Sequence, residues 1–326
     1  MLPARFLKGV VRMALGFIFS LIISVLFAAY AIPRKFSKQN AILYVMWMSI
    51  AYLIGTILIM SILWGFGFEK AEDLFSPWHL LTVARGIVWV FGMVAFNLAI
   101  DKIGLARFSK WKNIQGPVGS LLILFIVADM ELGINVLWLF LGMMLMLASA
   151  LMFQVKSDTI TDKNAKMGIA LGIFAGFCFG ISALINSVMT REEIVGEVFL
   201  FAQLLYHSLT LVICSAVLYI ALGNKISKGE PNAFRYRFGN LFKVNKKTWL
   251  PVIAGTMFLI AAFLTIYSYR LMPNAIAWSI TQLNIFWSVI IGVFIFKEIC
   301  FKTHWWRLTL GILFAFSALT FLFFAM

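Results

Sequence analysis

The polar side chains of greatest chemical interest lie in a short stretch between two apolar runs. Residues 106–120 (ARFSKWKNIQGPVGS) contain three cations, two amides and a Gly-Pro pair, and they separate GIVWVFGMVAFNLAI from LLILFIVA. If the stretch is helical, one face carries Ser109, Lys112, Asn113, Gly116 and Ser120. Amides, hydroxyls and an ammonium group on one face can hydrogen-bond a polar small molecule. We therefore expect this face to line a cavity, with a packed polar helix contact as the alternative.

A second stretch, residues 277–292 (AWSITQLNIFWSVIIG), has a similar character. Thr281, Asn284 and Ser288 share one helical face, and Gln282 lies beside them. Amides and hydroxyls suit a polyhydroxylated ligand, because hydrogen bonds take its hydroxyl groups while an indole ring, here Trp278, takes its C–H side. For the tryptophan alone, packing or contact with lipid is the alternative.

The composition places both stretches in a membrane protein. Hydrophobic residues make up 63% of the chain and charged residues 12%, whereas soluble domains hold about 45–50% and about 25%. No soluble core could bury so much apolar surface. The formal charge of +14 resides mostly in short connections between apolar runs, where basic residues set the orientation in the membrane. We therefore expect a lipid bilayer as a partner, and no nucleic acid.

Ten apolar segments are each long enough to cross a bilayer, which takes about 20 residues of helix. Lipid offers no hydrogen-bond partner to an open backbone, so we expect an all-α integral membrane protein. The expected spans are residues 10–32, 41–64, 78–100, 103–127, 133–154, 167–189, 196–222, 248–270, 273–297 and 305–325.

The ten spans divide into two sets of five around a polar link. An offset of 169 residues aligns the fourth span with the ninth and places Asn113 on Gln282 and Gln115 on Asn284. Because five is odd, two copies of a five-helix unit would enter the membrane from opposite sides, as in transporters built on inverted repeats. The expected units are a first five-helix repeat at 1–155, a polar linker at 156–166 and a second five-helix repeat at 167–326.

Pro117 affects the backbone of the fourth span. Proline has no N–H group, so the carbonyl of Asn113 loses the donor that a regular helix offers it. An unpaired acceptor persists in a membrane only when it is buried in protein or wetted by a cavity. The sequence thus predicts a free carbonyl at Asn113, beside its amide side chain.

The cationic residues of the fourth span differ in how deep they lie in the membrane. Arg107 and Lys110 lie in the first two turns, where long side chains reach the headgroups. Lys112 lies deeper, where an ionised group costs roughly 2.5–3.5 kcal/mol. We therefore expect Lys112 to face a cavity or a polar partner.

The sixth span contains glycines at a spacing of four: Gly168, Gly172, Gly176 and Gly180. Small residues at this spacing let helix backbones approach closely. We interpret this ridge as a packing or sliding surface and not as a ligand site.

His207, in QLLYHSLTL, lies inside the seventh span. It is a candidate for proton coupling, and a satisfied interior histidine is the alternative. None of the three histidines is followed four residues later by an acid, which argues against a membrane acyltransferase or a metalloenzyme. We expect no catalytic residues, no cofactor and no metal.

Several features together resemble the drug/metabolite transporter superfamily: ten spans, the five-plus-five organisation, and the acids Asp129 and Glu298 that close the fourth and ninth spans. The segment ARGIVWVFGMVAFNLAIDKIGLARFSKWKNIQGPVGSLL is similar to the third and fourth spans of its glucose/ribose porter branch. FAAYAIPRKFSKQN is similar to the first hairpin of the L-rhamnose–proton symporters. YSYRLMPNAIAWSITQLNIFWSVIIGVFIFKEI resembles the ninth span of both.

The resemblance implies a multi-pass transporter of the cell membrane that works by alternating access. Spans four and nine would line a central site, joined by parts of spans one, three, six and eight. The expected solute is a sugar, moved by proton symport. The expected substrate-binding residues are Lys112, Asn113, Gln115, Gln282 and Asn284 for polar contact, Trp111 and Trp278 for stacking, and Asn97 and Asn186 as weaker candidates.

Other solutes and another class of protein remain as alternatives. Lys110 and Lys112 stand where the family carries neutral residues, and two cations favour a sugar acid, a phosphorylated compound or another anion. An exporter of small metabolites is a further alternative. A non-transporting membrane protein, such as a lipid-modifying enzyme or an assembly partner, would be a different class, but a scaffold has no need for polar faces on two spans. No oligomeric state is predicted.

Overall fold

A computed structural model describes residues 4–37, 39–65, 75–126, 134–152, 162–190, 202–226, 234–297 and 301–325. Every regular element within these residues is a helix, in agreement with the expected all-α class. The long helices are α1 (Ala4–Ala29), α3 (Ala41–Gly65), α4 (His79–Ile103), α8 (Asp162–Thr190), α10 (Ala202–Ile226), α12 (Trp249–Leu271) and α15 (Phe301–Phe324). The shorter ones are α2 (Ile32–Phe36), α5 (Leu105–Lys112), α6 (Gln115–Ile126), α7 (Val136–Met152), α11 (Phe234–Leu241), α13 (Asn274–Thr281), α14 (Asn284–Ile290) and the π-helical turn η3 (Ile291–Ile295).

Within the described residues, eight helical segments are long and apolar enough to cross a membrane, so the chain is a multi-pass membrane protein. Two of the ten expected spans are represented by shorter apolar helices, α6 and α7. Ten spans in two inverted repeats therefore stay a prediction. The predicted linker at 156–166 is partly helical, since α8 begins at Asp162, and residues 153–161 lie outside the described residues.

The predicted fourth and ninth spans are each interrupted. Helix α5 ends at Lys112 and α6 begins at Gln115, while α13 ends at Thr281 and α14 begins at Asn284. The two gaps begin 169 residues apart (282 − 113 = 169), the same offset that aligns these spans in the sequence. Each of these two predicted spans is therefore built from a pair of short helices.

Backbone hydrogen bonds between residues three apart in the sequence form a tight turn at each interruption. The Gly116 N–H donates to the Asn113 carbonyl at 3.0 Å, and the Ile285 N–H donates to the Gln282 carbonyl at 3.2 Å. Each bond spans three residues instead of four, which tightens the chain locally. The free carbonyl predicted at Asn113 is thus not found: Pro117 removes the usual donor, and the tight turn supplies the preceding N–H in its place.

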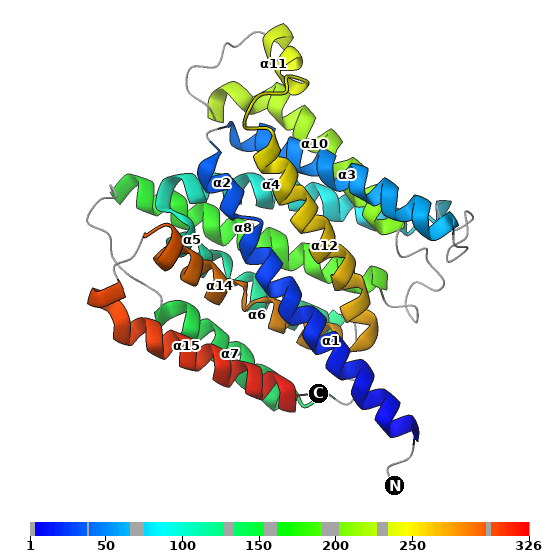
Figure 1. Cartoon of the computed structure of the whole chain (residues 1–326), viewed down its shortest axis with the longest axis vertical. Helices are drawn as coiled ribbons and strands as arrows, with labels where there is room; N and C mark the ends of the chain where they lie inside the picture. The colour runs from blue at the N-terminus through cyan, green and yellow to red at the C-terminus, as the bar shows by residue number, and fades with distance from the viewer. Residues whose placement is uncertain are drawn as a thin grey trace.

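The helices pack as a bundle in which α4 lies against α8, α1 against α12, and α3 against both α10 and α12. Figure 1 shows α7 and α15 together along one edge of the bundle and α3 and α10 at the other. The broken spans lie between these two edges in Figure 1. They contact each other there, α6 with α13 and α5 with α14. Helix α1 also contacts α13 and α14, so it closes the bundle over the second break.

The glycine ridge of α8 is the surface on which the fourth span rests. A Cβ atom on Gly176 would lie 2.7 Å from the Lys112 carbonyl oxygen, and one on Gly180 would lie 3.3 Å from the Gly119 nitrogen. Only glycine, which has no Cβ atom, lets the backbone of the fourth span come so close to α8. The prediction of close helix packing at this ridge is confirmed.

An ion pair joins two of the segments that carry the family resemblance. Arg34, in α2, is buried and pairs with Asp101, which lies near the end of α4. The same guanidinium donates to the Gln39 carbonyl at 2.8 Å and lies 5.2 Å from the centre of the Tyr44 ring. Asp129 and Glu298, the two acids of the resemblance, lie outside the described residues.

The ridge yields a stability prediction. Gly176→Ala should lower the free energy of unfolding by about 1–3 kcal/mol, because the added methyl group forces α8 away from the α5–α6 break. The measurement is thermal melting of the detergent-solubilised protein. Gly239→Ala is the matched control, since a Cβ there meets nothing within 4 Å. Equal melting temperatures for the two variants would contradict the packing assigned to α8.

Candidate functional site

A cavity of about 60 Å³ lies among α1, α4, α5, α6, α8, α12 and α13. At roughly 10–15 Å³ for each water, it is large enough for several. These helices belong to the predicted spans one, three, four, six, eight and nine, the same set that the resemblance implies for a central site. The aromatic lining consists of Phe27, Tyr30, Trp89, Phe179, Phe258, Tyr269 and Trp278. The polar lining consists of Arg85, Lys112, Gln115, Ser182, Asn186 and Thr265.

At one side of the cavity the two helix breaks are hydrogen-bonded to each other. The Lys112 Nζ donates to the Asn284 Oδ1 at 3.2 Å, and the Gln115 Nε2 donates to the Gln282 Oε1 at 2.7 Å. All four side chains are buried. The structure therefore brings together four of the predicted polar residues, two on each broken span.

Lys112 is buried without a carboxylate partner among the described residues. Its side chain is 5% exposed, and its Nζ lies 5.4 Å from the centre of the Phe96 ring and 5.8 Å from that of Phe179. Ring faces attract a cation electrostatically. An amide oxygen and two aromatic faces thus hold the ammonium group in an otherwise apolar wall.

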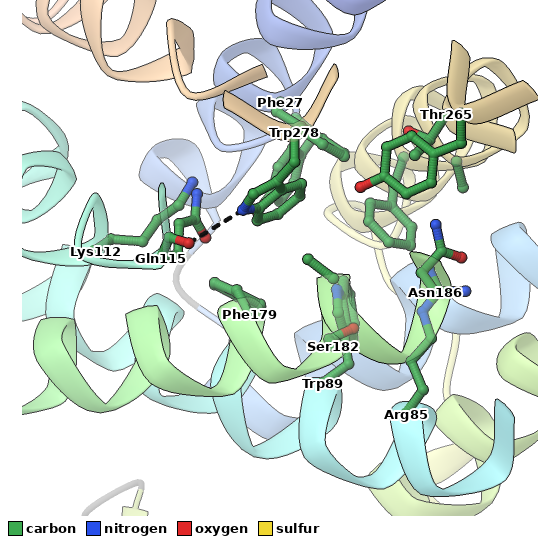
Figure 2. A pocket seen from close by; sticks show the side chains of 15 residues that line it. Phe27, Arg85, Trp89, Lys112, Gln115, Phe179, Ser182, Asn186, Thr265 and Trp278 are labelled. Carbon is green, nitrogen blue, oxygen red and sulfur yellow. Dashed lines mark hydrogen bonds between the residues drawn. The ribbon is translucent and has the colours of Figure 1, made fainter. Parts of the chain in front are cut away.

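Trp278 forms part of the cavity wall and is held there by the first break. Its Nε1 donates to the Gln115 carbonyl at 3.1 Å, the bond drawn in Figure 2. A Cβ on Gly119 would collide with the indole, so this glycine leaves the space that the ring occupies. Nearby, the hydroxyls of Ser120 and Ser279 are 2.8 Å apart and join α6 to α13.

Arg85 and Asn186 lie on the opposite side of the cavity from Lys112 and Gln115 (Figure 2). Asn186 is 3% exposed, and its Oδ1 has no hydrogen-bond partner among the described residues. Arg85 was not predicted as a site residue. The depth argument applied to Lys112 would not have found it, because Arg85 lies within the first two turns of α4, where a long side chain is expected to reach the headgroups.

His207 lies behind the cavity wall and does not line it. It is fully buried, and its Nδ1 is 3.3 Å from the Tyr52 hydroxyl. Its ring packs edge-on against Trp89, which does line the cavity, with the ring centres 5.9 Å apart. Proton coupling through His207 stays a prediction.

Five of the predicted contact residues lie outside the cavity lining: Gln282 and Asn284, which bond to lining residues, and Asn97, Trp111 and Asn113. The Asn97 Nδ2 donates to the Met93 carbonyl of its own helix at 2.9 Å. Trp111 is half-buried and packs against the apolar core. Asn113 is buried in the first break, where neither polar atom of its side chain has a partner among the described residues. Their role as substrate contacts stays a prediction.

Comparison with known proteins finds a likeness to one family over part of the chain. A family model described as "Sugar transport protein" matches residues 214–325, about a third of the chain, which include α12 to α15. A search of curated proteins found no match. A solved structure titled "Crystal structure of protein" has a TM-score of 0.61 and 11% sequence identity, and the alignment covers 95% of this chain and 98% of that chain. At this identity the likeness concerns the fold alone.

The buried lysine yields a second prediction. Lys112→Met should leave the melting temperature equal to that of the unaltered protein or above it, because the change keeps the side chain's length and removes a buried charge without a carboxylate partner. Asn284→Leu should lower stability by about 1–3 kcal/mol, since it removes the acceptor of that charge. Adding Lys112→Met to Asn284→Leu should recover part of the loss. Thermal melting of the three variants in detergent provides the measurement; a large loss with Lys112→Met alone would make Lys112 a structural residue.

Proposed function

We propose that this protein is a secondary transporter that moves a sugar by proton symport and alternating access. The observation that carries the proposal is the cavity at the hydrogen-bonded meeting point of two broken helices, where amide groups stand beside aromatic rings. The family-model match over α12 to α15 supports a sugar as the solute.

The chemistry of the lining suits a polyhydroxylated solute. Gln115 and Asn186 offer amide groups, Ser182 and Thr265 offer hydroxyls, and Trp278 offers a ring. Polar groups inside a membrane are costly, so a cluster of them around a cavity indicates a pathway and not a packing feature. Hydrogen bonds from these groups would replace those that the solute makes with water.

Alternating access is supported by the two breaks. Discontinuous helices that meet near the middle of a bundle are typical of transporters built on repeats. The three-residue hydrogen bonds at Asn113 and Gln282 are the kind of local tightening found at hinges. The glycine ridge of α8 gives the fourth span a smooth surface along which it can move.

Proton coupling is supported by the buried pair of His207 and Tyr52. The imidazole and the phenol are within hydrogen-bond reach of each other. Trp89, which packs against His207, and Phe258, which packs against Tyr52, both line the cavity. Histidine exchanges a proton near neutral pH more readily than other side chains. We therefore place the coupling proton on His207.

Transport by purified protein in liposomes tests the proposal. We expect an inward proton gradient to drive uptake of at least one labelled monosaccharide from a panel of neutral and acidic sugars. Gln282→Ala should reduce the rate by about 10-fold or more, because it leaves the Gln115 amide without its partner. Ser61→Ala is the matched control, since that hydroxyl is exposed and bonds its own helix backbone. If no sugar moves in either direction, the proposal fails; if Gln282→Ala transports normally, the bond between the two breaks is not needed for transport.

Coupling through His207 is tested separately. His207→Gln should abolish the acceleration of uptake by the proton gradient and preserve exchange of labelled for unlabelled sugar at equal pH. Exchange does not require net proton movement, so its survival shows that the protein is folded and binds its solute. Continued stimulation of His207→Gln by the gradient would exclude His207 as the proton carrier.

A further inference from the structure

Arg85 is a buried cation that lines the cavity, and the sugar contacts proposed above do not involve it. Its side chain is 8% exposed and lines the cavity from α4. Its Nε has no hydrogen-bond partner, and no ion pair of its guanidinium is found within the described part of the chain. A buried guanidinium is strongly disfavoured unless something else bonds to it.

Two other buried cations show how this protein satisfies such groups. Arg34 pairs with Asp101 and donates to a backbone carbonyl. Lys112 donates to Asn284 and rests against two aromatic rings. Arg85 has no comparable arrangement among the described residues. This difference indicates that the partner of Arg85 is a ligand that enters the cavity.

The surroundings of Arg85 define the charge of that ligand. The described residues that line the cavity include two cations, Arg85 and Lys112, and no aspartate or glutamate. The two cations stand on opposite sides, and Asn186 accompanies Arg85 with an unpaired amide oxygen (Figure 2). Inside a membrane such a cavity attracts negative charge and disfavours cations.

We propose that the transported solute is a sugar acid whose carboxylate binds to Arg85. The planar guanidinium presents two parallel N–H donors that match a carboxylate. The unpaired Oδ1 of Asn186 can accept a hydrogen bond from a hydroxyl of the solute, and the hydroxyl-bearing part of the solute extends along the aromatic wall toward Gln115 and Lys112. This inference rests on the proposed function and specifies the substrate of the same site.

Equilibrium binding to the unaltered protein provides the first test. The probes are glucuronate and galacturonate, each compared with its uncharged primary amide, with glucose and with glucose 6-phosphate. At least one acid should bind about 10- to 100-fold more tightly than its amide, since hydrogen bonds to charged groups have that strength. The amide keeps the shape of the acid, so the comparison isolates the charge without altering the protein.

Variants then locate the charge recognition. Arg85→Met should weaken acid binding about 10- to 100-fold and leave binding of the amide unchanged, while Arg85→Lys should restore part of the difference. Lys246→Met is the matched control, because it removes an exposed cation outside the cavity and should change neither affinity. Loss of acid and amide binding alike in Arg85→Met would assign Arg85 a structural role and overturn its part in recognition.

The outcomes separate this inference from the proposed function. If neutral sugars bind and are transported while the acids bind no better than their amides, the sugar-acid assignment fails and the transporter proposal stands. If the sugar phosphate binds in preference to both acids, the carboxylate assignment fails. If none of the probes binds or moves, the proposed function itself fails.

Discussion

The hydrogen bonds between the two helix breaks are the interaction on which the rest of the structure depends. An interrupted helix exposes backbone groups that lipid cannot satisfy. Here each break forms tight backbone turns and then bonds to the other through Lys112 with Asn284 and Gln115 with Gln282. These bonds place polar side chains next to a cavity in an otherwise apolar bundle. The bond from the Trp278 indole to the Gln115 carbonyl and the contact between the Ser120 and Ser279 hydroxyls join the same two spans beside the breaks.

Close packing of backbones makes this arrangement possible. The glycines of α8 allow the first break to lie directly on that helix, and Gly119 makes room for the indole of Trp278. Helix α1 covers the second break through its contacts with α13 and α14. Small residues at these contacts bring α5–α6, α8 and α13 near enough for the side chains of six spans to reach one cavity.

Among the described residues, Arg34, Lys112 and Arg85 are buried cations, and each needs a partner for its charge. How that need is met distinguishes structural from functional residues. Arg34 is satisfied by an acid and a carbonyl, and it connects α2 to α4. Lys112 is satisfied by an amide and two rings, and it connects the breaks. Arg85 has no such partner among the described residues, and we therefore assign it to the solute. A cation that the protein itself does not satisfy is costly to keep in a membrane, so its presence in a cavity points to recognition.

The sequence by itself determined that the protein is an all-α membrane protein and which spans carry the polar side chains. Its apolar runs required membrane helices, and the polar faces around Lys112 and Gln282 identified the spans that line the cavity, because helical spacing places those residues on one side. Tertiary structure alone decided which groups meet. No proline marks the break at Gln282, the Asn113 carbonyl finds a donor three residues away, and Trp111 and Asn97 lie outside the lining while Arg85 belongs to it. Periodicity describes one helix at a time, whereas a cavity results from how several helices pack against each other.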